Sequence, residues 1–195
     1  GRALLGGTDF ADRSEVEKLK AWLQEMVEKA QHFEQEHLQR TGKKLWLVIH
    51  LAPPCATFSK ARDRCWRTRV RSQTQPAGIK PNPWKVRNAN TVAKHAIIFA
   101  RWVVETLGAT VTLKNPFFSY LWIFGAPWMG SSRAYRDVRM NYCIFGMPYK
   151  KTTRFRVWNG DFSSLGRQCT TKKGVHTCGN PYHTHLEFGG ISTAF

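Results

Sequence analysis

The chain has 195 residues, of which 42% are hydrophobic, and its formal net charge is +17 at pH 7. This length and apolar content are typical of a globular domain with a substantial core, and they exclude an intrinsically disordered chain. No apolar run reaches the roughly 18 residues of a membrane span, and residues 1–7 are too short and too weakly apolar for a signal peptide.

The positive charge is distributed unevenly along the chain. Residues 1–42 contain 6 basic and 8 acidic side chains, whereas residues 43–195 contain 24 basic and 5 acidic ones. Nucleic acid, DNA or RNA, is the partner that this excess favours. An acidic membrane surface is an alternative, but no basic amphipathic helix supports it. The five cysteines are odd in number and widely spread, which favours reduced thiols in a nuclear or cytoplasmic compartment.

A long amphipathic helix is predicted over residues 14–40. Ser14 and Glu17 form a capping-box pattern, with the serine as N-cap, and Gly42 supplies the C-terminal stop. The apolar run 45–50 predicts a buried strand that leads directly into a loop containing Cys55.

Cys55 follows two prolines, which restrict the loop to few conformations. The carboxyl end of a strand is where open α/β sheets place their chemistry, so Cys55 is a candidate nucleophile. The alternative is a half-buried cysteine in an ordinary loop.

Residues 60–87 are predicted to form a long basic loop that binds nucleic acid. This segment contains many cations and a single acid, Asp63. It also contains two tryptophans, Trp66 and Trp84. Cations would contact phosphates and tryptophans would stack on bases. The predicted contact residues are Lys60, Arg62, Arg64, Trp66, Arg67, Arg69, Arg71, Lys80, Lys85 and Arg87.

The rest of the chain predicts an α/β fold with a mostly parallel sheet and an antiparallel end. A Gly-, Thr- and His-rich tail follows it, so we expect domains at 1–160 and 161–195. The further predicted elements are a helix from Asn90 to Thr106, strands at 109–113, 141–146 and 154–158, a turn at 114–116 and a short helix within 117–122.

Several segments together resemble the DNA cytosine-5 methyltransferase family, most closely its compact, mobile-element-type members. Pro53-Pro54-Cys55 with Phe58-Ser59 is similar to the nucleophile motif, and Lys114-Asn115-Pro116 stands where the family has Glu-Asn-Val or Glu-Asn-Pro. The segments 145–148 and 154–157 are similar to its later Phe-Gly-x-Pro-Gln and Arg-x-Arg block, and 7–10 is weakly similar to its Gly-Asp-Ile segment.

The resemblance implies a partial Rossmann-like methyltransferase sheet and a role for each matched residue. Cys55 would attack C6 of a flipped-out cytosine. Asn115 would support the nucleophile loop. Arg156 would hold the base, and Arg154 would support the loop that carries Arg156. Asp9 would contact S-adenosylmethionine, the methyl donor of the family.

Two departures from the family pattern bear on activity. Lys114 replaces the acid that hydrogen-bonds the cytosine ring, and a lysine does not relay a proton in the same way unless its pKa is depressed. The Gly-rich cofactor loop, which comes first in the family, is absent, and residues 188–195 are only loosely similar to it. We therefore expect a fragment or a derived domain, with a missing N-terminal segment or partner chain.

The tail predicts a zinc site, because a segment with few apolar residues gains order by binding a metal through N and S ligands. The predicted ligands are Cys169, Cys178, His183 and His185, with His176 as the substitute. The alternative is a basic tail without a metal.

Two functions remain open from the sequence. One is cytosine-5 methyl transfer to DNA or RNA through Cys55. The other is a catalytically inactive or incomplete module of the same fold that binds nucleic acid. A zinc deaminase lacks its signature motif, and the few acids after residue 42 offer no cluster for a nuclease.

Overall fold

A computed structural model describes residues 9–79, 81, 83–172, 175–179 and 184–185. Its centre is a four-stranded mixed sheet in the order β1-β2-β5-β3, formed by β1 (Val48–Leu51), β2 (Thr110–Pro116), β5 (Thr152–Trp158) and β3 (Arg136–Asn141). β1 and β2 pair in parallel, whereas β5 pairs antiparallel with both β2 and β3. The α/β class is as predicted, but a mostly parallel sheet is not, because the parallel part of this sheet consists of one pairing.

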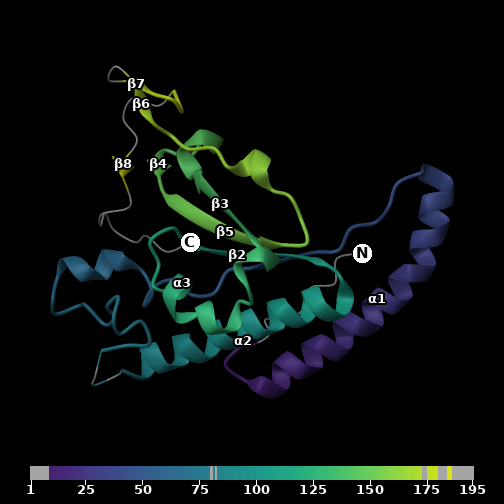
Figure 1. Cartoon of the computed structure of the whole chain (residues 1–195), viewed down its shortest axis with the longest axis horizontal. Coiled ribbons are helices and arrows are strands. Elements are labelled where there is room, and N and C mark those ends of the chain that lie inside the picture. Colours follow the sequence, from purple (N-terminus) through teal and green to yellow (C-terminus); the bar gives the residue numbers. More distant parts are fainter. Residues whose placement is uncertain (1–8, 80, 82, 173–174, 180–183, 186–195) are drawn as a thin grey trace.

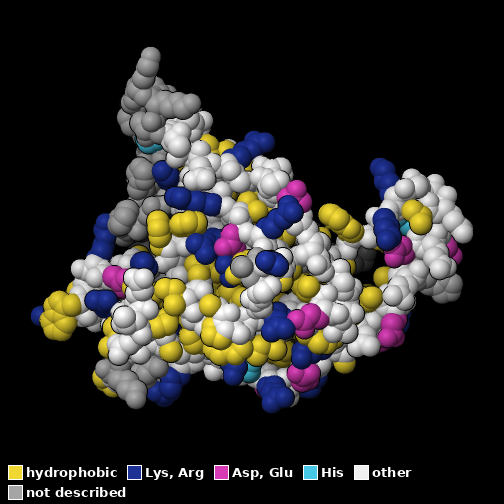
Figure 2. Space-filling view, viewed as in Figure 1, with side chains coloured by type: hydrophobic (Ala, Val, Ile, Leu, Met, Phe, Trp, Pro, Cys, Tyr) yellow, Lys and Arg dark blue, Asp and Glu magenta, His cyan; other side chains and the backbone are white. Residues whose placement is uncertain are grey.

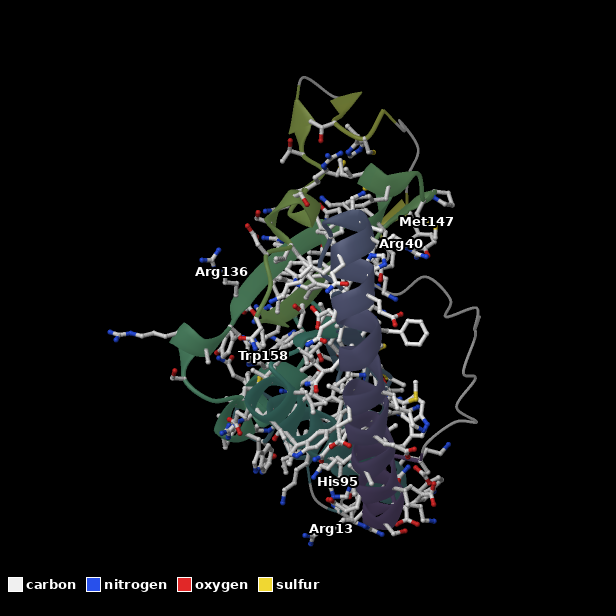
Figure 3. All side chains as sticks on the ribbon, turned by 90° about the vertical axis from the view of Figure 1, so that its right-hand side faces the viewer. Arg13, Arg40, His95, Arg136, Met147 and Trp158 are labelled. Atoms are coloured by element: carbon white, nitrogen blue, oxygen red, sulfur yellow. The ribbon has the colours of Figure 1, made fainter. Side chains whose placement is uncertain are left out.

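Helix α1 (Arg13–Thr41) matches the predicted long helix. Its N-cap is Asp12 rather than Ser14, because the Asp12 carboxylate accepts a hydrogen bond from the Ser14 backbone N–H at 2.8 Å. Gly42 ends the helix with a φ of 65°, a conformation that favours glycine. Figure 3 shows α1 running from Arg13 to Arg40, with His95 of the neighbouring helix beside its N-terminal half.

Helix α2 (Trp84–Leu107) begins six residues before the predicted start at Asn90. Pro83 precedes its first turn, a place where proline costs the helix no hydrogen bond. The predicted loop 60–87 was therefore too long, since it includes the first turn of α2 and a 3-10 helix, η1 (Lys60–Arg64).

Strand β3 lies five residues before the strand predicted at 141–146. Residues 142–145 instead form a 3-10 helix, η4 (Tyr142–Phe145), that ends at Gly146 with a φ of 87°. Three of the first four residues of β3 are charged, and Asp137 and Arg139 lie opposite Arg156 and Arg154 of β5. Cross-strand pairing engages these charged residues, while Val138 and Met140, at the alternate positions, are buried.

The remaining elements are short. They are α3 (Leu121–Phe124), η2 (Ala126–Trp128), η3 (Ser132–Ala134), β4 (Tyr149–Lys150), η5 (Ser163–Leu165), β6 (Thr171–Lys172), β7 (Val175–His176) and β8 (Thr184–His185). Strands β6 and β7 form an antiparallel pair at the end of the molecule opposite α2 (Figure 1).

The core lies between α2 and one face of the sheet, and α1 packs on the other side of α2 (Figure 1). Ile97, Ala100 and Val103 of α2 are fully buried, as are Val111 and Leu113 of β2. Within the described residues, no helix combines the length and apolar character needed to cross a membrane.

Candidate functional site

The loop containing Cys55 follows β1 at the carboxyl end of the parallel strand pair. Cys55 is half-buried. Its carbonyl oxygen accepts hydrogen bonds from the backbone N–H of Phe58 at 3.0 Å and of Ser59 at 2.8 Å, which closes a tight turn. The thiol is therefore held at a sheet edge by a turn with a fully buried aromatic residue, Phe58.

Asn115 contacts this loop directly from β2. Its side-chain amide donates to the Pro53 carbonyl oxygen at 3.0 Å, and only 1% of the residue is exposed. Its own carbonyl oxygen, Oδ1, has no hydrogen-bond partner within the described residues. Asn115 lies within β2, not in the turn predicted at 114–116, because this strand continues to Pro116. The rigid strand fixes the contact with Pro53.

Lys114 lies on the opposite face of β2 from Asn115, since successive strand residues alternate. Its charge acts on His50, whose ring Nδ1 is 2.7 Å from the Thr112 hydroxyl oxygen. Burial lowers the pKa of His50, and the positive charge of Lys114 lowers this pKa further. The structure thus separates Lys114 from the face on which Asn115 supports the Cys55 loop.

Arg156 and Arg154 share one carboxylate on β3. Arg156 is 6% exposed and binds Asp137 through two contacts of 2.8 Å, while its guanidinium lies 3.7 Å from the Tyr135 ring. Arg154 reaches Asp137 at 3.3 Å. Both guanidinium groups are engaged with protein partners, so their first role in the described structure is structural.

Arg139 adds a third cation to this group. Its guanidinium and that of Arg154 lie 4.3 Å and 4.6 Å from the same ring, that of Phe117. Arg139 and Arg154 lie opposite each other in the register, and Arg154 lies opposite Asn115. Nε of both arginines is buried without a hydrogen-bond partner within the described residues. Three arginines and one aspartate leave an excess of positive charge on this part of the sheet.

Residues 60–69, which we name the cationic loop, follow the Cys55 turn. They contain five basic residues and one acid. Trp66 is 79% exposed, and the guanidinium of Arg67 lies 5.4 Å from its ring. Trp84, at the start of α2, is 63% exposed. Figure 2 shows several Lys and Arg side chains at the end of the molecule where Figure 1 places this loop.

The other predicted contact residues differ in their surroundings. Arg71 is 1% exposed, so it does not present its charge to a nucleic acid as we predicted. Lys85 and Arg87 are exposed on the first turn of α2, and Lys80 lies outside the described residues. Asp9 is exposed, and its carboxylate accepts the backbone N–H of Ala11 at 2.8 Å in the turn before α1.

Three cysteines meet where the tail returns to the sheet. The sulfur atoms of Cys143, Cys169 and Cys178 all lie within 4.8 Å of one another, close enough to hold a metal ion. His176 Nδ1 lies 3.8 Å from the Cys169 sulfur. Burial raises the pKa of the Cys143 thiol to about 12.

Cys169, Cys178 and His176 are among the ligands predicted from the sequence, but Cys143 is not, because it was predicted to lie in a strand. The glycine in its Tyr-Cys-x-Phe-Gly context is a turn signal that could have located it outside a strand. His183 and the side chain of His185 lie outside the described part of the chain.

No protein-family model matches this chain, and a search of the curated proteins finds no match. The resemblance to cytosine-5 methyltransferases therefore depends on the short motifs, and the site has to be interpreted from its own chemistry.

Proposed function

We propose that the chain is a nucleic-acid-binding module whose interface is the cationic loop together with the first turn of α2. The observation that carries this proposal is Trp66, a largely exposed tryptophan between arginines on a chain of net charge +17. Exposed aromatic rings stack on bases, and neighbouring cations neutralise phosphates. An exposed tryptophan without such a partner keeps a large apolar ring in water.

The single acid of the cationic loop does not oppose this charge at the surface. The Tyr120 hydroxyl donates to the Asp63 carboxylate at 2.5 Å, and Lys60 lies 5.4 Å from the ring of the same tyrosine. Asp63 therefore anchors the loop to the segment after β2. The outer side of the loop is left with arginines, which suit phosphate binding because of their planar fork of donors.

A nucleic-acid titration at several salt concentrations tests the proposal. We expect the logarithm of the binding constant for single- and double-stranded oligonucleotides to fall linearly with the logarithm of the salt concentration, with a slope near −0.9 per phosphate neutralised on a duplex. Trp66→Ala should weaken binding about tenfold through lost stacking. Trp46→Ala is the matched control, because Trp46 is 70% exposed but lies outside the cationic loop.

Variants that each lose one positive charge test whether binding depends on the cationic loop or only on the net charge of the chain. Arg67→Gln should weaken binding and reduce the salt slope, whereas Lys29→Gln removes the same charge from α1, where Lys29 pairs with Glu25. Equal losses for both variants, or binding insensitive to salt, would count against a defined interface at the cationic loop.

A second candidate is cytosine-5 methyl transfer, and the hydrogen bond from Asn115 to the Cys55 loop favours it. In this reaction the Cys55 thiolate would add to C6 of a flipped cytosine and would leave again once the C5 proton had been removed by a base. S-adenosylmethionine, when bound, would supply the methyl group that C5 gains. The engaged state of Arg156 and the position of Lys114 favour the binding module instead.

Covalent trapping distinguishes the two functions. A 5-fluorocytosine oligonucleotide with S-adenosylmethionine should give an adduct that survives denaturation if Cys55 is the nucleophile, and Cys55→Ser should abolish it. Oligonucleotide binding with no adduct leaves the module as the function.

A further inference from the structure

We infer that Cys143, Cys169, Cys178 and His176 form a structural zinc site that fastens the C-terminal segment to the sheet. This site differs from the tail-only set predicted from the sequence, because Cys143 comes from η4, directly after β3. It is also independent of nucleic-acid binding, since none of its residues belongs to the cationic loop.

The distances among the three sulfurs are close to those of tetrahedral coordination, and His176 lies beside one of them. Two sulfurs that each lie about 2.3 Å from zinc are separated by about 3.7 Å, and a sulfur and a nitrogen ligand by about 3.5 Å. The three sulfurs lie within 4.8 Å of one another, and His176 Nδ1 lies 3.8 Å from Cys169. Shifts of about an ångström would bring the three sulfurs to one ion, and the His176 ring, which now lies beside Cys169, would move toward the other two sulfurs to supply the fourth ligand. None of the three cysteines is in a disulfide bond.

The backbone around the cysteines is already ordered by hydrogen bonds. The buried Asn141 accepts the Cys169 backbone N–H at 2.7 Å through Oδ1, and its own N–H donates to the Arg167 carbonyl at 3.0 Å. The Thr177 N–H donates to Thr170 O at 2.9 Å, which places His176 and Cys178 next to Cys169. The hydrogen bonds bring the ligands together from three separate segments.

The ligand types select the metal. Three thiolates and an imidazole are typical of structural zinc sites, whereas magnesium and calcium require oxygen ligands. Binding deprotonates the thiols and releases their protons to solvent, with no change of oxidation state. A closed set of four protein ligands leaves no position for a substrate, so the role is structural.

Metal analysis of the reduced, purified chain is the first test. We expect about one zinc per chain. Cobalt substitution should give strong sulfur-to-metal charge-transfer absorption in the near ultraviolet and the intense ligand-field bands of a tetrahedral ion. Three of the five cysteines should resist alkylation until a chelator is added. A chain that takes up neither zinc nor cobalt would overturn the proposal.

Variants then test the ligand set. Cys143→Ser should weaken zinc binding, measured by chelator competition, by more than about a hundredfold, since even an outer-shell change costs up to that much. Cys65→Ser is the matched control and should retain the metal, because Cys65 is exposed elsewhere. His176→Asn should keep the sulfur bands and shift the ligand-field bands. Full zinc affinity in Cys143→Ser, or an unchanged cobalt spectrum in His176→Asn, would refute this assignment.

Discussion

The guanidinium of Arg71 lies 3.7 Å from the centre of the Phe58 ring, and both residues are fully buried. Arg71 also donates to the Thr57 carbonyl at 2.9 Å and to the Asn90 side-chain oxygen at 2.7 Å. One buried cation therefore joins the Cys55 turn to helix α2. Burial lowers the pKa of Arg71 to about 10, and the side chain stays charged at neutral pH.

Arg71→Lys should lower the free energy of unfolding by about 2–4 kcal/mol, because a lysine cannot serve the same fork of acceptors and leaves buried oxygens without donors. Denaturant unfolding measures this change. Arg67→Lys is the charge-matched control at an exposed position, with an expected change within about 0.5 kcal/mol. Equal effects in the two variants would show that the contacts of Arg71 contribute little.

Asn115→Leu removes the donor to the Pro53 carbonyl. We expect a loss of about 1–3 kcal/mol in the free energy of unfolding, since a buried carbonyl is left without its partner. Because the loop is then less restrained, Cys55 should be alkylated faster. Cys65, which is exposed and does not depend on Asn115, is the internal reference. Alkylation of Cys55 at an unchanged rate would contradict a supporting role for Asn115.

Asp137→Asn should destabilise the sheet, since Arg156 would be buried without a charged partner. The Arg156 side chain is 7% exposed and that of Asp137 is 34% exposed, so we expect about 2–3 kcal/mol. Glu105→Gln breaks the exposed pair with Arg101 on α2 and should cost at most about 0.5 kcal/mol. Urea titrations of both variants give the comparison.

His50 should make the protein less stable in mild acid. Its pKa is lowered in the folded chain by burial and by Lys114, so the folded state binds fewer protons than the unfolded state. The stability linked to this group is fully present above the unfolded pKa of about 6.5 and is lost as the pH falls toward the folded pKa.

Lys114→Met should raise the pKa of His50 toward its ordinary value, as followed by NMR of the histidine ring. The rise should be partial, since burial is the larger cause. No change in the titration of His50 would show that Lys114 does not act on it. The matched control is Lys150→Met, on β4.

The positions of the long helices could be predicted because their signals are local. Apolar spacing and a following glycine predicted the end of α1 at Gly42, and α2 ends in the same way at Gly108; both glycines have a positive φ. The start of α2 could not be found in this way, because Asn90 looks like a cap but binds Arg71 and the Ala77 carbonyl.

Local patterns also misplaced β3, since its charged residues have partners on β5 that neighbouring residues in the sequence do not reveal. Charge and tryptophan content indicated a nucleic-acid interface, and the resemblance to cytosine-5 methyltransferases implied that Asn115 supports the loop of Cys55. These signals depend on composition and neighbours in the sequence.

The amino-acid sequence by itself determined the α/β class, the basic character and the strand-end location of Cys55, because these follow from periodicity, charge and turn chemistry. Only the tertiary structure decided which cations are exposed and which thiols meet. Arg71 and Arg67 are the same residue type in the same segment, but Arg71 is enclosed by carbonyl oxygens and Arg67 is exposed to solvent. Cys143 joins Cys169 and Cys178 because η4 and the tail converge in space, a contact between residues distant in the chain that no local pattern encodes.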